Sequence, residues 1–258
     1  MATSALLIDA AVIRGTSAVS WLDTSAAINL YADLSSEAAG VAPWLVPGHL
    51  LDDLGTLPLP VRYGFSHIVS DAPLDEVAAH LLQLRHLQTS DGQRFYFRFA
   101  DTRVLKACQR AWPQPMRARV KGPITRWTWY DRRSVLSSFA SEVAGVRRPL
   151  GALSLAQFQA LIDAGAADRM ANALEELRQA GLHPVQNADQ FDHVEAAVAF
   201  MGAEPPYGWT VQRAIARQAV LTGGRALGDA AFHALLADKP PAEAIDAWHL
   251  GGPTGNAE

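Results

Sequence analysis

The spacing of apolar residues changes along the chain, and this change restricts the folds that the sequence can adopt. Up to about residue 131, extended apolar runs are interspersed with helix-like segments, whereas from about Ser154 apolar residues recur at helical spacing. This order predicts an α/β (α+β) N-terminal lobe with a mixed sheet and flanking helices over residues 1–148. An all-α C-terminal lobe over 149–250 and a disordered tail over 251–258 are expected to follow.

The N-terminal lobe contains runs of both kinds. Strands are expected at residues 5–13, 43–47, 64–70, 94–99 and 124–130, and helices within 25–38, from 74 to about 85 and from 102 to 112. The strand at 43–47 is expected to lie beside the strand at 64–70. Asp71 and Asp101 are candidate N-caps, and Asp91-Gly92 marks a turn between two extended stretches.

The strand at 94–99 is followed by a polar cluster. Its alternating phenylalanines are predicted to face the core, and Arg98, Asp101 and Arg103 lie next to them in the sequence. An Arg–Asp pair in this cluster could fix the corner between the strand and the following helix.

Helix signals dominate the second half. Ser154 and Gln157 fit a capping box. Gly181 is expected to close one helix as its C′ residue, and Thr210 is a candidate cap of a later one.

Composition limits the classes of protein to which the chain can belong. The 258 residues are 49% hydrophobic and 19% charged, as in ordinary globular proteins, and the single cysteine, Cys108, excludes an intrachain disulfide or a multi-cysteine zinc site. No run approaches the roughly 20 apolar residues of a membrane span, and the first residues lack the basic region of a signal peptide. We expect a soluble, cytoplasmic protein without cofactor, metal site or membrane partner.

Charge is distributed unevenly. Seven basic residues and one acid lie between Arg110 and Arg133, whereas the rest of the chain has 15 basic and 25 acidic residues and a net charge of −10. Trp112, Trp127 and Trp129 are interleaved with these cations, a combination that single-strand nucleic-acid binders use. Two other interpretations stay open: tryptophans in the core with arginines on the opposite strand face, or a surface for an acidic protein partner. The overall charge of −4 argues against general affinity for nucleic acid.

Candidates for catalysis are few. Ser66, His67 and Asp101 could serve a small hydrolase, but a strand projects Ser66 and His67 to opposite faces. We find no phosphate-binding glycine loop in the sequence, and we predict no catalytic residue.

The order of several motifs resembles a known family, the type VI secretion effector chaperones (adaptors), first labelled only as a domain of unknown function. The motifs cover about residues 5 to 131. They are Leu6-Leu7-Ile8-Asp9-Ala10, Ala42-Pro43-Trp44-Leu45-Val46, the helix entry at 70–81, Asp91-Gly92, the segment from Phe97 to Leu105, and Gly122-Pro123-Ile124. The chain departs from the family's usual Phe-Arg-Phe-Tyr-Asp-Pro-Arg-Val pattern at Ala100 and Thr102, and its segment between Ile13 and Ala26 is shorter.

The resemblance implies a non-enzymatic protein that binds a cognate toxic effector and delivers it to a VgrG or PAAR spike protein. On this reading, the polar cluster and the basic aromatic segment contact the partner, and the helical lobe sets partner choice. The candidate partner-binding residues are Arg98, Asp101, Arg103, Arg117, Arg119, Arg126, Trp127 and Trp129. The alternatives are a small hydrolase with a site near Ser66, His67 and Asp101, and a nucleic-acid-binding module that uses residues 110–133.

Overall fold

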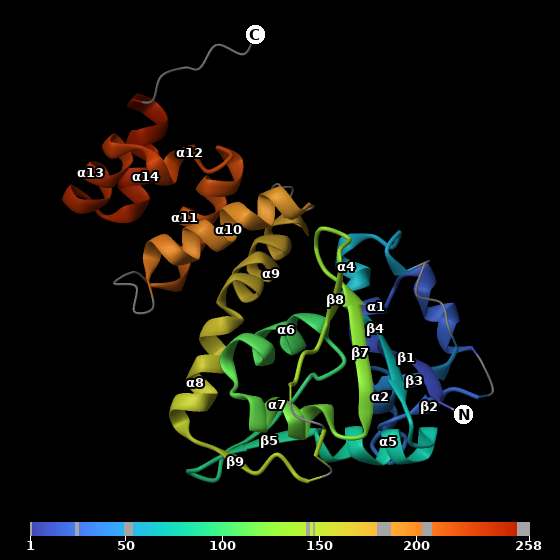
Figure 1. The fold of residues 1–258 in the computed structure, drawn as a ribbon. Helices are drawn as coiled ribbons and strands as arrows, with labels where there is room; N and C mark the ends of the chain where they lie inside the picture. The colour runs from blue at the N-terminus through green and yellow to red at the C-terminus, as the bar shows by residue number, and fades with distance from the viewer. Residues whose placement is uncertain are drawn as a thin grey trace. The chain divides into compact units, whose positions relative to one another are not determined.

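The computed structural model divides the chain into two units, Met1–Gly165 and Ala166–Glu258, which are described separately. The residues that it describes are 2–23, 26–48, 54–142, 145–146, 148–179, 187–202 and 208–251. The first unit contains strands and helices and the second contains helices, which confirms the predicted fold class (Figure 1).

The first unit alternates short strands and helices along the chain. Its strands are β1 (Thr3–Asp9), β2 (Ile28–Asn29), β3 (Pro43–Pro47), β4 (Phe65–Ser70), β5 (His86–Thr89), β6 (Arg94–Tyr96), β7 (Ile124–Tyr130), β8 (Leu136–Ser138) and β9 (Ala152–Leu153). Its helices are α1 (Ala10–Ile13), the 3-10 helix η1 (Ser17–Leu22), α2 (Ser36–Ala39), α4 (Leu59–Arg62), α5 (Leu74–Gln83), α6 (Thr102–Ala111), α7 (Gln114–Lys121) and α8 (Leu155–Ala164).

The main sheet is antiparallel. In the part of the chain that the structure describes, it has six strands in the order β2-β3-β1-β4-β7-β8. The central strand β1 places Leu7 opposite Leu45 of β3 on one side and Ser66 of β4 on the other. The prediction that β3 and β4 are neighbours is therefore wrong, because β1 lies between them. A central strand covered on both faces explains the nearly continuous apolar run of its sequence.

Asp9 ends β1 and begins α1. Its carboxylate accepts hydrogen bonds from the backbone N–H groups of Ala11 and Val12, as an N-cap does. The predicted strand at 5–13 is thus too long, since the chain turns into a helix after Asp9. The predicted helix within 25–38 is also reduced, to the single turn of α2.

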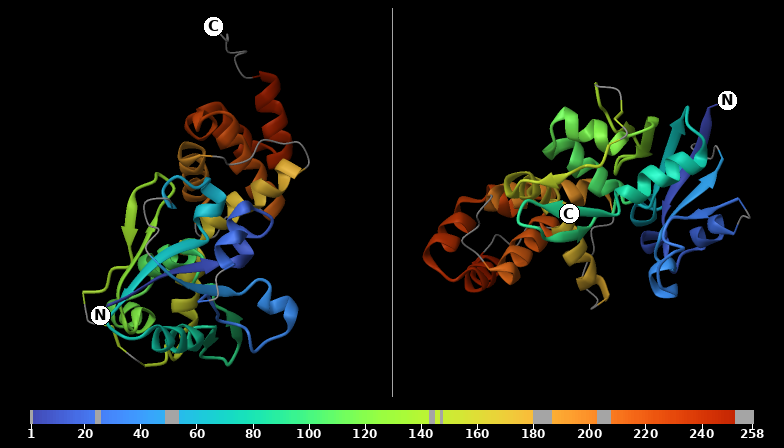
Figure 2. Two further views of the ribbon diagram at one scale, coloured as in Figure 1. Left: turned by 90° about the vertical axis from the view of Figure 1, so that its right-hand side faces the viewer. Right: turned by 90° about the horizontal axis from the view of Figure 1, so that it is seen from below.

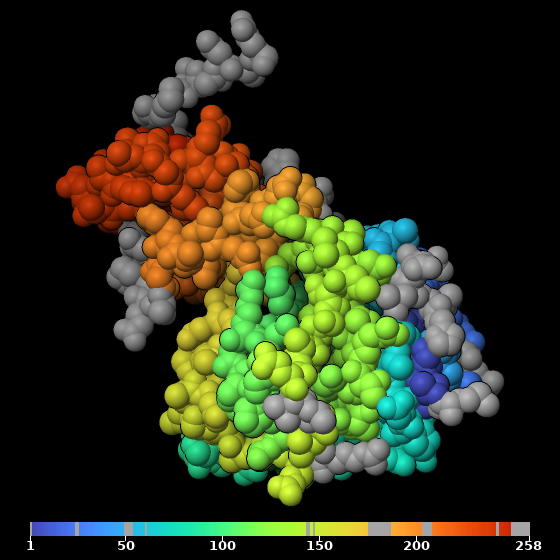
Figure 3. Space-filling model, in the orientation of Figure 1, coloured from blue at the N-terminus to red at the C-terminus, as the bar shows by residue number. Residues whose placement is uncertain are grey.

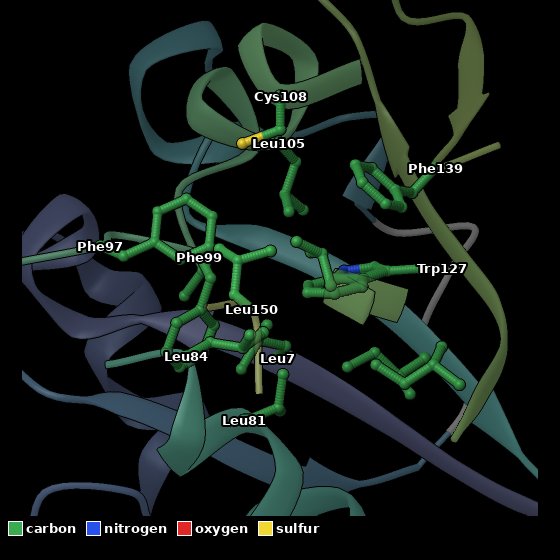
Figure 4. Close-up of a cluster of buried hydrophobic side chains, with 14 of the residues drawn as sticks. Leu7, Leu81, Leu84, Phe97, Phe99, Leu105, Cys108, Trp127, Phe139 and Leu150 are labelled. Atoms are coloured by element: carbon green, nitrogen blue, oxygen red, sulfur yellow. The ribbon is translucent and has the colours of Figure 1, made fainter. Parts of the chain in front are cut away.

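The larger core of the first unit covers one face of the sheet. Leu7 of β1 and Trp127 of β7 pack there with Leu81 of α5 and Leu105 of α6, and all four are buried (Figure 4). α5 follows Pro73, whose side chain makes no cap, so the predicted Asp71 cap is wrong.

A second core covers the opposite face of the sheet. Leu6 and Ile8, which alternate with Leu7 along β1, pack there with Ile13 and Phe65. Figure 2 shows α6 and α7 (green) on one side of the strands and the N-terminal segment with α1 and η1 (blue) on the other.

Helix α7 is not among the helices expected from the sequence, because Pro113 and Pro115 are residues that usually end a helix. Pro113 is its N-cap and Pro115 lies in its first turn. Backbone N–H groups of the first turn have no acceptor within the helix, so a proline there removes no helical hydrogen bond. Gly122 ends the helix at a φ of +53°, and a Cβ at this position would overlap the ring of His80. Glycine is therefore required at 122 for two reasons, its backbone conformation and its contact with His80.

A second, smaller sheet has the order β6-β5-β9. The predicted turn at Asp91-Gly92 joins β5 and β6 as a hairpin, and the Thr89 hydroxyl donates to the Asp91 carboxylate. β9 pairs with β5 in parallel, with Gln88 opposite Ala152. β9 and α8 thus lie in the first unit although they follow residue 148, and the predicted capping box at the start of α8 is confirmed.

The second unit is a set of helices around its own apolar core. The helices are α9 (Ala166–Gln179), α10 (Ala188–Met201), α11 (Trp209–Leu221), α12 (Arg225–Gly228), α13 (Ala230–Asp238) and α14 (Pro241–Gly251). Val194, Ile215 and Phe232 are fully buried in that core. α11 begins after Gly208, so the predicted Thr210 cap is wrong. The predicted C′ residue Gly181 and the predicted tail after Gly251 lie outside the described residues.

Candidate functional site

Four charged side chains meet where the end of β1 approaches the start of α6, and we name this cluster the acid–arginine corner: Asp9, Arg98, Asp101 and Arg103. Arg103 holds Asp101 in a bidentate ion pair, with Nε 2.9 Å from Oδ1 and Nη2 2.7 Å from Oδ2. Arg98 Nη2 lies 3.0 Å from Asp9 Oδ2 and 3.7 Å from Asp101 Oδ2. The predicted polar cluster is therefore one ion network, and it contains a fourth member, Asp9, that was not expected.

Each carboxylate of the corner also caps a helix. Asp101 accepts from the backbone N–H of Arg103, which confirms it as the N-cap of α6, and Asp9 caps α1. Burial raises the pKa of Asp9 above its ordinary value of 3.8, the Arg98 charge opposes this shift, and the Asp101 charge adds to it. The corner thus concentrates two buried acids at two helix N-termini, where the helix dipoles favour negative charge.

The corner presents mainly one side chain to solvent. The Arg98 side chain is 48% exposed, compared with 16% for Arg103 and 5% or less for the two carboxylates. The Arg103 guanidinium lies over the Tyr63 ring at 4.9 Å from its centroid. Asp101 and Arg103 therefore stabilise the corner, and Arg98 is the member that a partner could reach.

The tryptophans of the basic segment belong to the core. Trp127 is fully buried, Trp129 is 4% exposed and Trp112 is 3% exposed. Trp127 Nε1 donates to Ser66 Oγ at 2.8 Å, inside the sheet. The structure thus bears out the interpretation that places these tryptophans in the core, and not the one in which Trp127 and Trp129 form a stacking surface, because the apolar face of β7 points to the helices that cover it.

The three arginines of this segment that are candidate partner-binding residues lie on two elements. Arg117 and Arg119 are half-buried on α7, and Arg119 Nη1 donates to the carbonyl oxygen of Leu150 at 3.0 Å. Arg126 is exposed on β7. Arg119 therefore has a structural role, while Arg117 and Arg126 keep solvent-accessible surface.

A hollow of about 390 Å³ lies between α6 and the hairpin of β7 and β8, and sequence reasoning missed it. Figure 3 shows α6 (green) and this hairpin (yellow-green) side by side on the face toward the viewer. Lys106, Gln109 and Arg110 line it from α6. The strand side consists of Trp129, Asp131, Ser137, Ser138 and Ala140. Lys106 and Arg110 are four residues apart on α6, so helical spacing could have placed them on one face, but no local signal places β8 beside them.

The residues of the hydrolase alternative are not brought together. Ser66 Oγ is the acceptor for Trp127, and the Asp101 carboxylate is held by Arg103. His67 Nε2 lies 2.7 Å from the hydroxyl of Ser4, which can also donate to the carbonyl oxygen of Gly48 at 3.2 Å. When the single hydroxyl hydrogen points to Gly48, the imidazole is the donor to Ser4 and not its general base.

The described ranges contain no group of three or more His, Cys, Asp or Glu side chains that could hold a metal ion. None of the helices described is long and apolar enough to span a bilayer.

Comparison with family models of known proteins gives a match to the N-terminal part of the chain. Residues 6–119 match the family described as "Domain of unknown function (DUF4123)". The match runs from β1 into α7 and includes the whole acid–arginine corner. Searches of curated proteins and of solved structures give no significant match.

Proposed function

We propose that the chain is a non-enzymatic adaptor that binds a cognate type VI secretion effector and helps to load it onto a VgrG or PAAR spike protein. The proposal rests on the ordered motifs of residues 5 to 131, and the match over residues 6–119 covers most of them. The acid–arginine corner is the observation that carries it furthest. Asp9 belongs to the first motif and Arg98, Asp101 and Arg103 to the segment from Phe97 to Leu105, and the fold joins these two motifs in one ion network.

The placement of the candidate residues favours protein binding over the two alternatives. A single-strand nucleic-acid binder needs accessible rings on which bases stack, and the tryptophans of residues 110–133 are buried. A hydrolase near Ser66 needs a base within hydrogen-bond reach, and Ser66 is bonded to Trp127 instead. Exposed cations, by contrast, suit an acidic protein partner, and Arg98 and Arg126 supply them on the first unit.

The test is co-purification of the full chain with the products of neighbouring toxin and spike genes. We expect one toxin to form a stable complex with the chain, and deletion of the adaptor gene to remove that toxin from the secreted fraction without removing the spike. A folded chain that retains none of these products would overturn the proposal.

Charge reversal then tests the surface. We expect the pair Arg117→Glu and Arg126→Glu to weaken the complex, because both side chains have accessible surface on the basic segment. Arg14→Glu is the matched control, since Arg14 is an exposed cation at the end of α1, outside that segment. Circular dichroism of each variant separates lost binding from lost folding. If co-purification is unchanged in the paired variant, the basic segment is not the binding surface.

A further inference from the structure

Strand β8 is at the end of the main sheet, and one of its two edges has no neighbouring strand among the described residues. In the described part of the chain it pairs with β7 alone. The N–H of Asp131 donates to the carbonyl oxygen of Val135, and the N–H of Phe139 donates to that of Trp127. Backbone groups alternate in direction along a strand, so those of Leu136 and Ser138 point away from β7. Such outward groups are the template to which another strand can bind.

The hairpin that carries this edge is fixed in position. The Arg62 guanidinium donates to the carbonyl oxygen of Asp131 at 3.0 Å and to Ser134 Oγ at 2.8 Å. The Asp131 carboxylate accepts from the N–H groups of Arg133 and Val135. Arg62 is 8% exposed, so the hairpin tip is held by a buried guanidinium. A preorganised edge loses little conformational entropy when it binds a partner.

Helix α6 limits the free edge and supplies charge beside it. The outward N–H of Ala140 is already bonded to Gln109 Oε1 at 3.1 Å, so the open part of the edge comprises Leu136 and Ser138. The hollow next to it is lined by Lys106 and Arg110 and by one acid, Asp131, whose carboxylate serves the turn. Side chains of an added strand that face α6 would therefore lie beside two basic side chains, Lys106 and Arg110.

The opposite face of β8 carries an exposed apolar side chain. Leu136 is 50% exposed and lies opposite Tyr130. Side chains of an added strand on this face would meet Leu136. Because side chains alternate between faces, the edge selects acidic residues at every second position and apolar residues between them.

We propose that the free edge of β8 binds an extended segment of the effector, in which carboxylate and apolar side chains alternate, as an additional antiparallel or parallel strand. This inference rests on the proposed adaptor function and names the segment chemistry that the adaptor recognises. Backbone hydrogen bonds to Leu136 and Ser138 provide affinity, Lys106 and Arg110 select the acids, and Leu136 packs against the apolar residues.

The first test uses a fluorescent peptide of alternating glutamate and valine and the full chain. We expect saturable binding, and no binding of the same peptide with lysine in place of glutamate. Ser138→Pro removes the outward N–H without removing a bond to β7, since proline is tolerated on the free side of an edge strand. It should weaken peptide binding about tenfold or more. Ser138→Ala keeps the N–H and should bind as the wild type does.

The second test uses charge. Lys106→Glu with Arg110→Glu should weaken peptide binding about tenfold or more, whereas Arg14→Glu should not. Equal binding of the glutamate and lysine peptides, or binding unaffected by Ser138→Pro, would overturn the inference. A dimer of the chain that Ser138→Pro dissociates, without peptide binding, would also overturn it by assigning the edge to a second copy.

Co-purification with the effector separates the two proposals. If Ser138→Pro and the Lys106/Arg110 variant still retain the effector, the β8 inference fails and the adaptor function stands. If the wild type binds the peptide but no toxin or spike product, the adaptor function fails.

Discussion

Asp9 and Arg98 are 89 residues apart in the sequence, and their 3.0 Å ion pair joins the end of the central strand to the loop that precedes α6. The same Arg98 nitrogen lies 3.7 Å from Asp101, so one guanidinium lies between two buried carboxylates, and Arg103 provides the second positive charge. This network connects the ends of a strand and two helices, and its effect on stability and on pH dependence can be measured.

Removal of the Asp101 carboxylate should destabilise the chain strongly. Asp101→Ala leaves the Arg103 guanidinium without its bidentate partner and removes the N-cap of α6, and we expect a loss of about 3 kcal/mol in unfolding free energy. Arg103→Lys keeps the charge but loses the bidentate geometry and should cost about 1 kcal/mol. Urea denaturation measures both. If both variants lose similar amounts of unfolding free energy, the bidentate geometry of the Asp101–Arg103 pair contributes more to stability than the presence of the carboxylate.

Asp9 should make stability fall as pH rises. Because burial raises its pKa above 3.8, the folded chain binds this proton more tightly than the unfolded chain between 3.8 and the raised value. The unfolding free energy of the wild type minus that of Asp9→Asn should therefore decrease through this window and stay constant above it.

Asp91 provides the control of opposite sign. The hydrogen bond from Thr89 chiefly lowers the pKa of Asp91 below 3.8. Its contribution is thus present above 3.8 and lost as pH falls through the lowered value. The difference between wild type and Asp91→Asn should increase with pH. A change with pH in the same direction for both variants would contradict the assignment of the Asp9 shift to burial.

Gly122 and Gly92 separate backbone strain from steric overlap. Both have positive φ, +53° and +86°, but a Cβ at 92 meets nothing within 4 Å, whereas one at 122 overlaps His80. Gly92→Ala should cost about 1 kcal/mol from conformation alone. Gly122→Ala should cost at least twice as much, as measured by thermal and urea denaturation. Equal losses would mean that His80 moves aside freely.

Trp127 and Ser66 should be energetically coupled. Trp127→Phe leaves the fully buried Ser66 hydroxyl without its donor and opens a small cavity, with an expected loss of about 3 kcal/mol. In the double variant with Ser66→Ala, no unpaired hydroxyl remains, so the combined loss should be smaller than the sum of the single losses by about 1 kcal/mol. Strict additivity would show that the hydrogen bond contributes nothing.

Asp229 and Trp248 connect the start of α13 to α14 in the helical unit. Trp248 Nε1 donates to Asp229 Oδ2 at 2.9 Å, and this bond chiefly lowers the pKa of the carboxyl below 3.8. Trp248→Phe should therefore accelerate amide exchange in α13 and α14 at neutral pH, and the effect should shrink as pH falls below 3.8 through the lowered value. The amides of residues 1–165 serve as the internal control, and their hydrogen-exchange rates should not change.

Local sequence signals predicted the elements better than their arrangement. The strand at 43–47, the Asp101 cap and the capping box at Ser154 are confirmed, because each depends on residues a few positions apart. The order of strands is a long-range property, and the position of β1 between β3 and β4 was missed. Asp9 was assigned to a strand because its apolar neighbours hid its role as a cap.

The candidate site was predicted in part for the same reason. Arg98, Asp101 and Arg103 are neighbours in the sequence and could be grouped, whereas Asp9 and the β8 edge join their partners only through the folded sheet. Tryptophan composition does not tell which strand face the rings occupy, so Trp127 was placed among the candidate binding residues although the fold buries it.

The parallel pairing of β9 with β5 has a consequence for the order in which the chain is synthesised. Residues 152 and 153 complete a sheet whose other strands are made more than fifty residues earlier. A nascent chain that has emerged only to α7 or β7 therefore carries a β5–β6 hairpin whose β5 edge is still unpaired. Translation must proceed past β9 before that edge is paired. A chaperone that protects exposed strand edges would act on the nascent chain before β9 is made.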